Sequence, residues 1–138
     1  TKSMLAVWRD WGLDKLLKSA YEKGTIMCGV SAGAICWFDS GITDSWSSDL
    51  RLMNCLAFTK GACCPHFDEE PERRPTVHRM IKDKDISECI AIDGGCALHL
   101  INEAPHGSIV FSENKNAYCV SMENDVIDES PYPSIDIF

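Results

Sequence analysis

The hydrophobic pattern opens with a helical period. Between residues 2 and 23, apolar side chains recur near helical spacing, which predicts helix over this stretch. Gly12 predicts a break, Asp14 a capped restart, and Gly24 the end of the second part. The chain is therefore expected to begin with helix on both sides of a break.

Two short runs contain almost no polar side chains, namely residues 25–30 (TIMCGV) and residues 89–92 (CIAI). Such runs predict strands that are buried on both faces of a parallel sheet. The second run ends in Asp93 and a Gly-Gly turn, so this acid is expected at the carboxyl end of its strand. Residues 32–38 are apolar without alternation and predict a helix that ends at Gly41. Helix followed by buried strand is the order of elements in α/β proteins.

The remaining pattern completes this α/β prediction. The polar residues 42–49 predict a loop over the site, and residues 76–84 predict an amphipathic helix. Three short strand-like runs predict an antiparallel meander, and no element is predicted after residue 125. These runs are residues 96–101, 108–113 and 117–122. We expect a single domain over residues 1–138, with a three-layer α/β/α architecture, a mostly parallel sheet and an antiparallel edge meander.

The net charge of the chain argues against anionic partners. The chain of 138 residues carries 13 Lys and Arg against 21 Asp and Glu, a net charge of -8. This balance repels phosphate backbones and anionic lipid, so neither nucleic acid nor a membrane is expected as a partner. No apolar run approaches the roughly 20 residues that span a bilayer, and the first residues lack a signal-peptide pattern. A cytoplasmic location is therefore expected.

The eight cysteines form no Cys-x-x-Cys pair, and several lie in apolar segments. Buried free thiols are the favoured interpretation. A zinc site from Cys63, Cys64, His66 and His78 is the alternative, but adjacent cysteines share a tetrahedral ion only with strained geometry. We therefore do not expect a zinc site.

Candidate chemistry centres on a Gly-x-Ser-x-Gly motif at residues 29–33, set between a predicted buried strand and a predicted helix. This context is typical of a nucleophile elbow, in which the serine oxygen projects above the sheet. Ser31 is then the candidate nucleophile, and the N–H of Ala32 the candidate donor to an oxyanion. The alternative is a structural turn whose serine only caps the next helix.

A serine hydroxyl needs a base to take its proton. Four histidines are available, and we favour His66, because Pro65 would fix its loop and Asp68 could hold it in place. The other three are His78 in a predicted helix, His99 in a predicted strand and His106 in a predicted turn.

The base in turn needs a carboxylate. Asp93 is the first candidate, because the end of its strand should lie at the same sheet edge as Ser31, where open α/β sheets bind ligands. Asp44, in the polar loop, is the competing candidate, and an ordinary turn aspartate is the alternative interpretation of Asp93.

Four segments together resemble the peptidase E (aspartyl dipeptidase) family of serine peptidases, which also includes cyanophycinase-like enzymes. They are Gly-Val-Ser-Ala-Gly-Ala, Ser-Gly-Ile-Thr-Asp-Ser, Cys-Pro-His-Phe-Asp and the Asp-Gly-Gly turn. The resemblance runs in order from residue 1 to about residue 101. It implies an α/β/α sheet related to class I glutamine amidotransferases, with Ser31 as nucleophile and His66 as base. The acid of the family, often a glutamate, maps to Asp93, and its loop aspartate maps to Asp44.

The resemblance also implies a substrate, a small peptide and in particular a dipeptide with an amino-terminal aspartate. A cationic side chain would be needed for the substrate carboxylate, and Arg73, Arg74 and Arg79 lie where the family suggests one. Relatives have earlier strands and a glycine-rich loop before the part that matches this chain. Another segment or another chain is expected to supply those strands.

The sequence therefore predicts a serine-type peptidase that acts on small aspartyl peptides. This hydrolase chemistry implies no metal or organic cofactor. A cyanophycinase-like hydrolase is the related alternative. A weak or inactive family fragment that serves as a binding or regulatory module is the alternative outside the enzymes.

Overall fold

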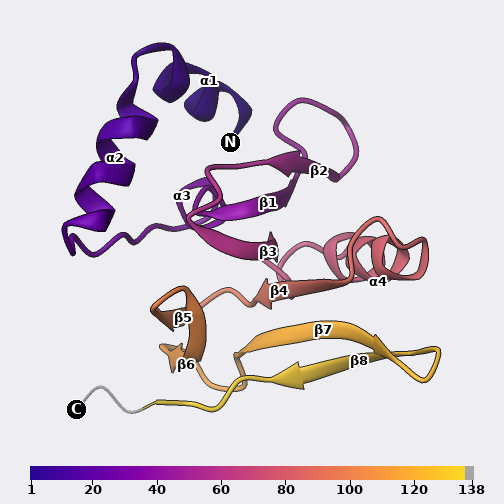
Figure 1. Ribbon diagram of the computed structural model, residues 1–138. Coiled ribbons are helices and arrows are strands. Elements are labelled where there is room, and N and C mark those ends of the chain that lie inside the picture. The colour runs from indigo at the N-terminus through magenta and orange to yellow at the C-terminus, as the bar shows by residue number, and fades with distance from the viewer. Residues whose placement is uncertain (136–138) are drawn as a thin grey trace.

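The computed structural model describes residues 1–135, whose centre is a six-stranded mixed sheet (Figure 1). The strand order is β2-β1-β3-β4-β7-β8. Parallel pairing is confined to the middle, between β1 and β3 and between β3 and β4. Antiparallel strands extend the sheet at both edges. The strands are β1 (Phe38–Thr43), β2 (Arg51–Asn54), β3 (Thr59–Cys64), β4 (Glu88–Ile92), β7 (Ala117–Glu123) and β8 (Val126–Pro131).

Four helices and a second, two-stranded sheet surround this centre. The hairpin of β5 (Cys96–Ile101) and β6 (Ala104–Val110) forms the small sheet. The helices are α1 (Lys2–Asp10), α2 (Leu13–Glu22), α3 (Ala32–Ile35) and α4 (Arg73–Lys82). Within residues 1–135, no helix has both the length and the apolar character needed to cross a membrane.

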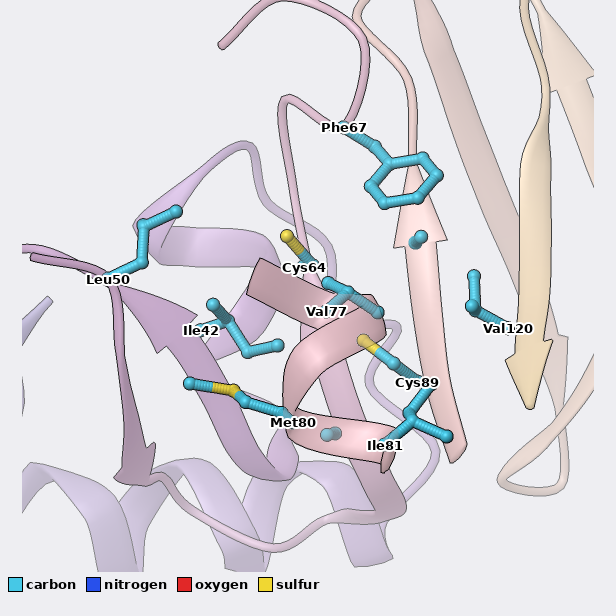
Figure 2. Packing of buried hydrophobic residues seen from close by; sticks show 11 residues of the cluster. Ile42, Leu50, Cys64, Phe67, Val77, Met80, Ile81, Cys89 and Val120 are labelled. Atoms are coloured by element: carbon cyan, nitrogen blue, oxygen red, sulfur yellow. The ribbon is translucent and has the colours of Figure 1, made fainter. Parts of the chain in front are cut away.

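The main core lies between α4 and one face of the large sheet (Figure 2). Val77, Met80 and Ile81 of α4 belong to one buried cluster with Ile42 of β1 and Cys89 of β4. The burial of these side chains removes apolar surface from water and is the main favourable term in folding. This contact fixes α4, and with it the turn that precedes α4, relative to the carboxyl ends of β1, β3 and β4.

The opposite face of the sheet is covered by α3 and by β5. Ile35 of α3 packs with Cys63 and Ile90, and Leu98 and Leu100 of β5 lie against this group. Neighbouring residues in one strand therefore face opposite layers, as Cys63 and Cys64 do in β3. The central strands are consequently buried on both faces, as the apolar run of residues 89–92 predicted.

A third cluster attaches α1 to the β2 edge. Leu5 is buried against Cys36 and Cys55. The Arg9 guanidinium also donates a hydrogen bond of 2.8 Å to the carbonyl of Cys55. The predicted break at Gly12 is confirmed, because that residue adopts a left-handed conformation between α1 and α2.

The α/β class is confirmed, and so are the strand at residues 89–92 and the helix near residues 76–84. The prediction of a mostly parallel sheet is corrected, because only two of the five strand pairs in the large sheet are parallel. The predicted edge meander is also different: β5 and β6 form their own sheet, and β8 lies in the tail for which no element was predicted. The predicted helix over residues 32–38 was too long. It ends as α3 at Ile35, and β1 already includes Phe38 and Gly41.

The predicted strand at residues 25–30 is wrong for the described chain. These residues form no strand, and Ile26 and Val30 expose 90% and 83% of their surface. An apolar run becomes a buried strand only where neighbouring strands supply hydrogen bonds and other layers supply packing. No strand among residues 1–135 pairs with this segment.

This difference in burial predicts opposite outcomes for two isoleucines. Ile42→Ala removes a fully buried side chain and is expected to lower the free energy of unfolding by about 2 to 5 kcal/mol. Ile26→Ala changes an exposed side chain and is expected to stay within about 0.5 kcal/mol of wild type. Urea unfolding of both variants measures the difference. Equal effects would contradict the described burial of residues 25–30.

Candidate active site

Ser31 occupies a sharp turn between residues 25–30, which form no helix or strand, and α3. Its backbone has φ 54° and ψ -116°, a conformation that a non-glycine residue adopts only under strain. Gly29 makes the turn possible, because a β-carbon at that position would overlap the backbone of Gly33. The turn therefore has the local geometry of a nucleophile elbow, although the residues before it form no strand.

His66 follows β3 and reaches Ser31 across the carboxyl edge of the sheet. Its Nε2 lies 3.0 Å from the Ser31 hydroxyl oxygen. The His66 backbone also has a positive φ, 55°, and Phe67 beside it is buried in the main core. The structure thus brings together the two residues that the sequence proposed as nucleophile and base.

A carboxylate faces the other side of the imidazole, and it belongs to Glu69. The Nδ1 of His66 lies 2.6 Å from Oε2 of Glu69. An ionised carboxylate only accepts hydrogen bonds, so Nδ1 carries the proton and Nε2 of the neutral ring is free to accept from Ser31. The chain Ser31–His66–Glu69 has the connectivity of a catalytic triad. Glu69 is half exposed, at 51% of its side chain.

Asp93 does not take this position. One of its carboxylate oxygens accepts a hydrogen bond of 3.1 Å from the N–H of Asn116. The other is buried without a partner among the described residues. Burial raises the pKa of Asp93, and the N–H of Asn116 only partly offsets that effect. The sequence placed Asp93 correctly after β4, but its carboxylate lies in the turn rather than against His66.

Ala32, the candidate oxyanion donor, is the first residue of α3. Its N–H makes no backbone hydrogen bond within the described part of the chain, whereas the N–H groups of Gly33, Ala34 and Ile35 all bond to carbonyls. The donor is therefore available beside the serine, as a nucleophile elbow requires.

The remaining predicted site residues lie outside the hydrogen-bonded chain of Ser31, His66 and Glu69. Asp44 follows β1 at the carboxyl edge and lines a cavity of about 910 Å³ together with Arg79. Arg79 is half exposed, and a nitrogen of its guanidinium lies 3.6 Å from a carboxylate oxygen of Asp83.

The other two arginines are held by neighbouring residues. Arg73 is buried, and its guanidinium donates hydrogen bonds to the Glu70 carboxylate and to the carbonyl of Ile42. The Arg74 guanidinium pairs with Glu129 and covers the ring of Phe67.

The other three histidines are also placed. His78 lies 2.6 Å from a carboxylate oxygen of Glu129 on β8. His99 and His106 lie edge to face on the β5–β6 hairpin. None of the three contacts Ser31 in the described chain, which leaves His66 as the imidazole at the elbow.

The sequence interpretation missed Glu69. The sequence spacing could have indicated Glu69, because it lies three residues after His66 in the segment that begins at Pro65. A tight turn of that length can direct both side chains to one side. The sequence pattern instead favoured Asp93, after a strand, and Asp44, in the polar loop, as acids, with Asp68 as a residue that could hold His66 in place.

The fold and this serine–histidine–carboxylate geometry together agree with the family drawn from the motifs. A family model described as Peptidase family S51 matches residues 1–106. The chain therefore belongs to peptidase family S51. It is similar to the uncharacterized peptidase YgaJ of Bacillus subtilis (strain 168), with 41% identity over 133 residues. The alignment covers 96% of this chain but only 57% of that relative.

The raised pKa of Asp93 predicts a pH-dependent gain in stability on its replacement. When the folded pKa of an acid is raised, the unfolded state loses its proton first as the pH rises, so stability falls through that range. Asp93→Asn removes this penalty, while its amide oxygen can still accept from Asn116. The variant should unfold at higher urea concentration than wild type at neutral pH, with the gain vanishing below about pH 3.5. The exposed Asp49→Asn serves as control, and an equal gain at both pH values would contradict the assignment.

Proposed function

We propose that this chain carries the nucleophile, the base and the acid of a serine-type peptidase. One observation carries the proposal: the Ser31 hydroxyl lies 3.0 Å from the imidazole of His66, and that imidazole lies 2.6 Å from the carboxylate of Glu69. Membership of peptidase family S51 supports the same reaction class. Since the chain spans 57% of the relative's length, the activity of the whole protein is part of the proposal.

The mechanism follows from these three side chains. Ser31 attacks the carbonyl carbon of the scissile bond while His66 Nε2 takes its proton. Glu69 holds the ring and stabilises the imidazolium that forms. The N–H of Ala32 donates to the developing oxyanion. His66 then protonates the leaving amine, and a water molecule activated by the same imidazole releases the acyl group from Ser31.

The proposed substrates are small peptides with an amino-terminal aspartate, cleaved in the cytoplasm. Support comes from the motif resemblance. Asp44 and Arg79 share a cavity at the α4 side of the sheet, and the described residues that line this cavity do not include Ser31, His66 or Glu69. A carboxylate there can accept from a substrate ammonium group, and an exposed guanidinium can bind a substrate carboxylate in bidentate fashion. Arg73 is buried and held by Glu70, and Arg74 is held by Glu129. The Arg79 guanidinium also lies 3.6 Å from a carboxylate oxygen of Asp83, but it is more exposed than the other two.

A fluorophosphonate probe tests the proposed nucleophile without requiring the natural substrate. Such a probe bonds its phosphorus to an activated serine oxygen and releases fluoride. We expect labelling at Ser31 that is abolished in Ser31→Ala and in His66→Ala, as measured by peptide mass spectrometry. A folded wild-type chain that stays unlabelled would favour a binding or regulatory module instead.

The identity of the acid is tested by a matched pair of variants. Glu69→Gln keeps the shape of the side chain but removes the charge that orients and stabilises the imidazole, so labelling should slow by about 100- to 10,000-fold. Asp93→Asn should label at nearly the wild-type rate, because Asp93 does not contact His66. The reverse result would restore Asp93 as the acid.

Substrate choice is tested with the dipeptides Asp-Leu, Glu-Leu and Asn-Leu. We expect kcat/KM for Asp-Leu to exceed that for Asn-Leu by roughly tenfold or more, since a charge-assisted contact is lost in the amide. Arg79→Met should reduce this ratio, and Lys60→Met, a change on the exposed surface of β3, should leave it unchanged. Equal cleavage of all three dipeptides would exclude aspartyl specificity and would turn attention to polymers of the cyanophycin type.

A further inference from the structure

The turn that carries His66 and Glu69 is attached to the rest of the protein through the next strand. The N–H of Phe67 donates a hydrogen bond of 3.0 Å to the carbonyl of Ile92, the last residue of β4. The Phe67 side chain is buried in the main core (Figure 2). These contacts fix the backbone between His66 and Glu69, but they do not determine where the Glu69 side chain points.

Asp68 supplies a second attachment, and it is directed at the turn after β4. One of its carboxylate oxygens accepts a hydrogen bond of 2.8 Å from the N–H of Gly94. The other forms an ion pair with Lys115. Burial alone would raise the pKa of Asp68, but the hydrogen bonds from Lys115 and Gly94 lower it overall. Asp68 is therefore held ionised between two donors from different segments.

Gly94 also defines the space in which the Glu69 carboxylate lies. A β-carbon at position 94 would overlap that carboxylate, so Glu69 lies directly against the glycine backbone. The same residue thus donates to Asp68 and supports Glu69. Behind it, the N–H of Asp93 bonds to the carbonyl of Asn116, which ties this turn to the start of β7.

We propose that Asp68 and Gly94 are positioning residues for the acid of the triad. Asp68 draws the turn after β4 toward the His66 loop, and the glycine of that turn then confines the Glu69 carboxylate to the side of the imidazole. Neither residue touches a substrate or the reacting atoms. This inference rests on the proposed function, because it assigns the residues that hold Glu69 in its role.

The test measures the rate constant for fluorophosphonate labelling of Ser31 in the full chain. Asp68→Ala removes both attachments and should slow labelling by roughly 10- to 100-fold, the scale expected when a catalytic group is displaced. Asp68→Asn keeps an oxygen that can accept from Gly94 and should recover most of the rate. Gly94→Ala should slow labelling at least as much as Asp68→Ala. Lys60→Met, which lies outside these contacts, serves as control.

A double-mutant cycle separates positioning from general loss of structure. If Asp68 acts through Glu69, then Asp68→Ala should have almost no further effect on labelling in a Glu69→Gln background. Thermal unfolding of each variant confirms that it is folded at the assay temperature. An equal slowing by Asp68→Ala in both backgrounds, or no slowing in either, overturns the positioning role while leaving Ser31 and His66 intact. A wild-type chain that is not labelled at Ser31 overturns the proposed function and this inference together.

Discussion

The candidate site depends on one contact, the hydrogen bond between Ser31 and His66 across the carboxyl edge of the sheet. Both residues hold the backbone at positive φ, 54° and 55°, which costs on the order of 1 to 3 kcal/mol for each non-glycine residue. Such strain persists only where the surroundings determine the conformation. At Ser31 the glycine at position 29 allows the backbone to approach α3, and at His66 the buried side chain of Phe67 anchors the turn.

The packing of α4 against the sheet also helps to hold the His66 turn in its conformation. Its apolar face packs on β1 and β4, and the turn from His66 to Glu70 lies between β3 and that helix. Arg73, in the first turn of α4, donates to the carbonyl of Ile42 in β1 and thereby fixes the helix start against the sheet. The position of the imidazole therefore depends on the packing of the core, because displacement of α4 would move the loop that carries His66.

The parts of this arrangement that sequence reasoning predicted are those with a local pattern. The elbow at Ser31, the strand before Asp93 and the break at Gly12 each depend on a few adjacent residues. Glu69 was missed because its role depends on the angle of a turn and on Gly94, a residue from another strand end. The prediction of a strand at residues 25–30 was wrong for a different reason. Their composition indicates a segment suited to burial, but composition does not say whether another segment is present to bury it, and Ile26 remains exposed.

Three consecutive acids follow Phe67, and each carboxylate contacts a different cationic or imidazole side chain. Asp68 pairs with Lys115, Glu69 with His66, and Glu70 with Arg73. His66 lies in the turn itself, Arg73 in the first turn of α4, and Lys115 just before β7. Lys115 and Arg73 each pair with a neighbouring acid, and the Glu69 carboxylate contacts the imidazole. Because Asp68 and Glu70 are held by these cations, Glu69 is the one of the three acids whose carboxylate faces His66.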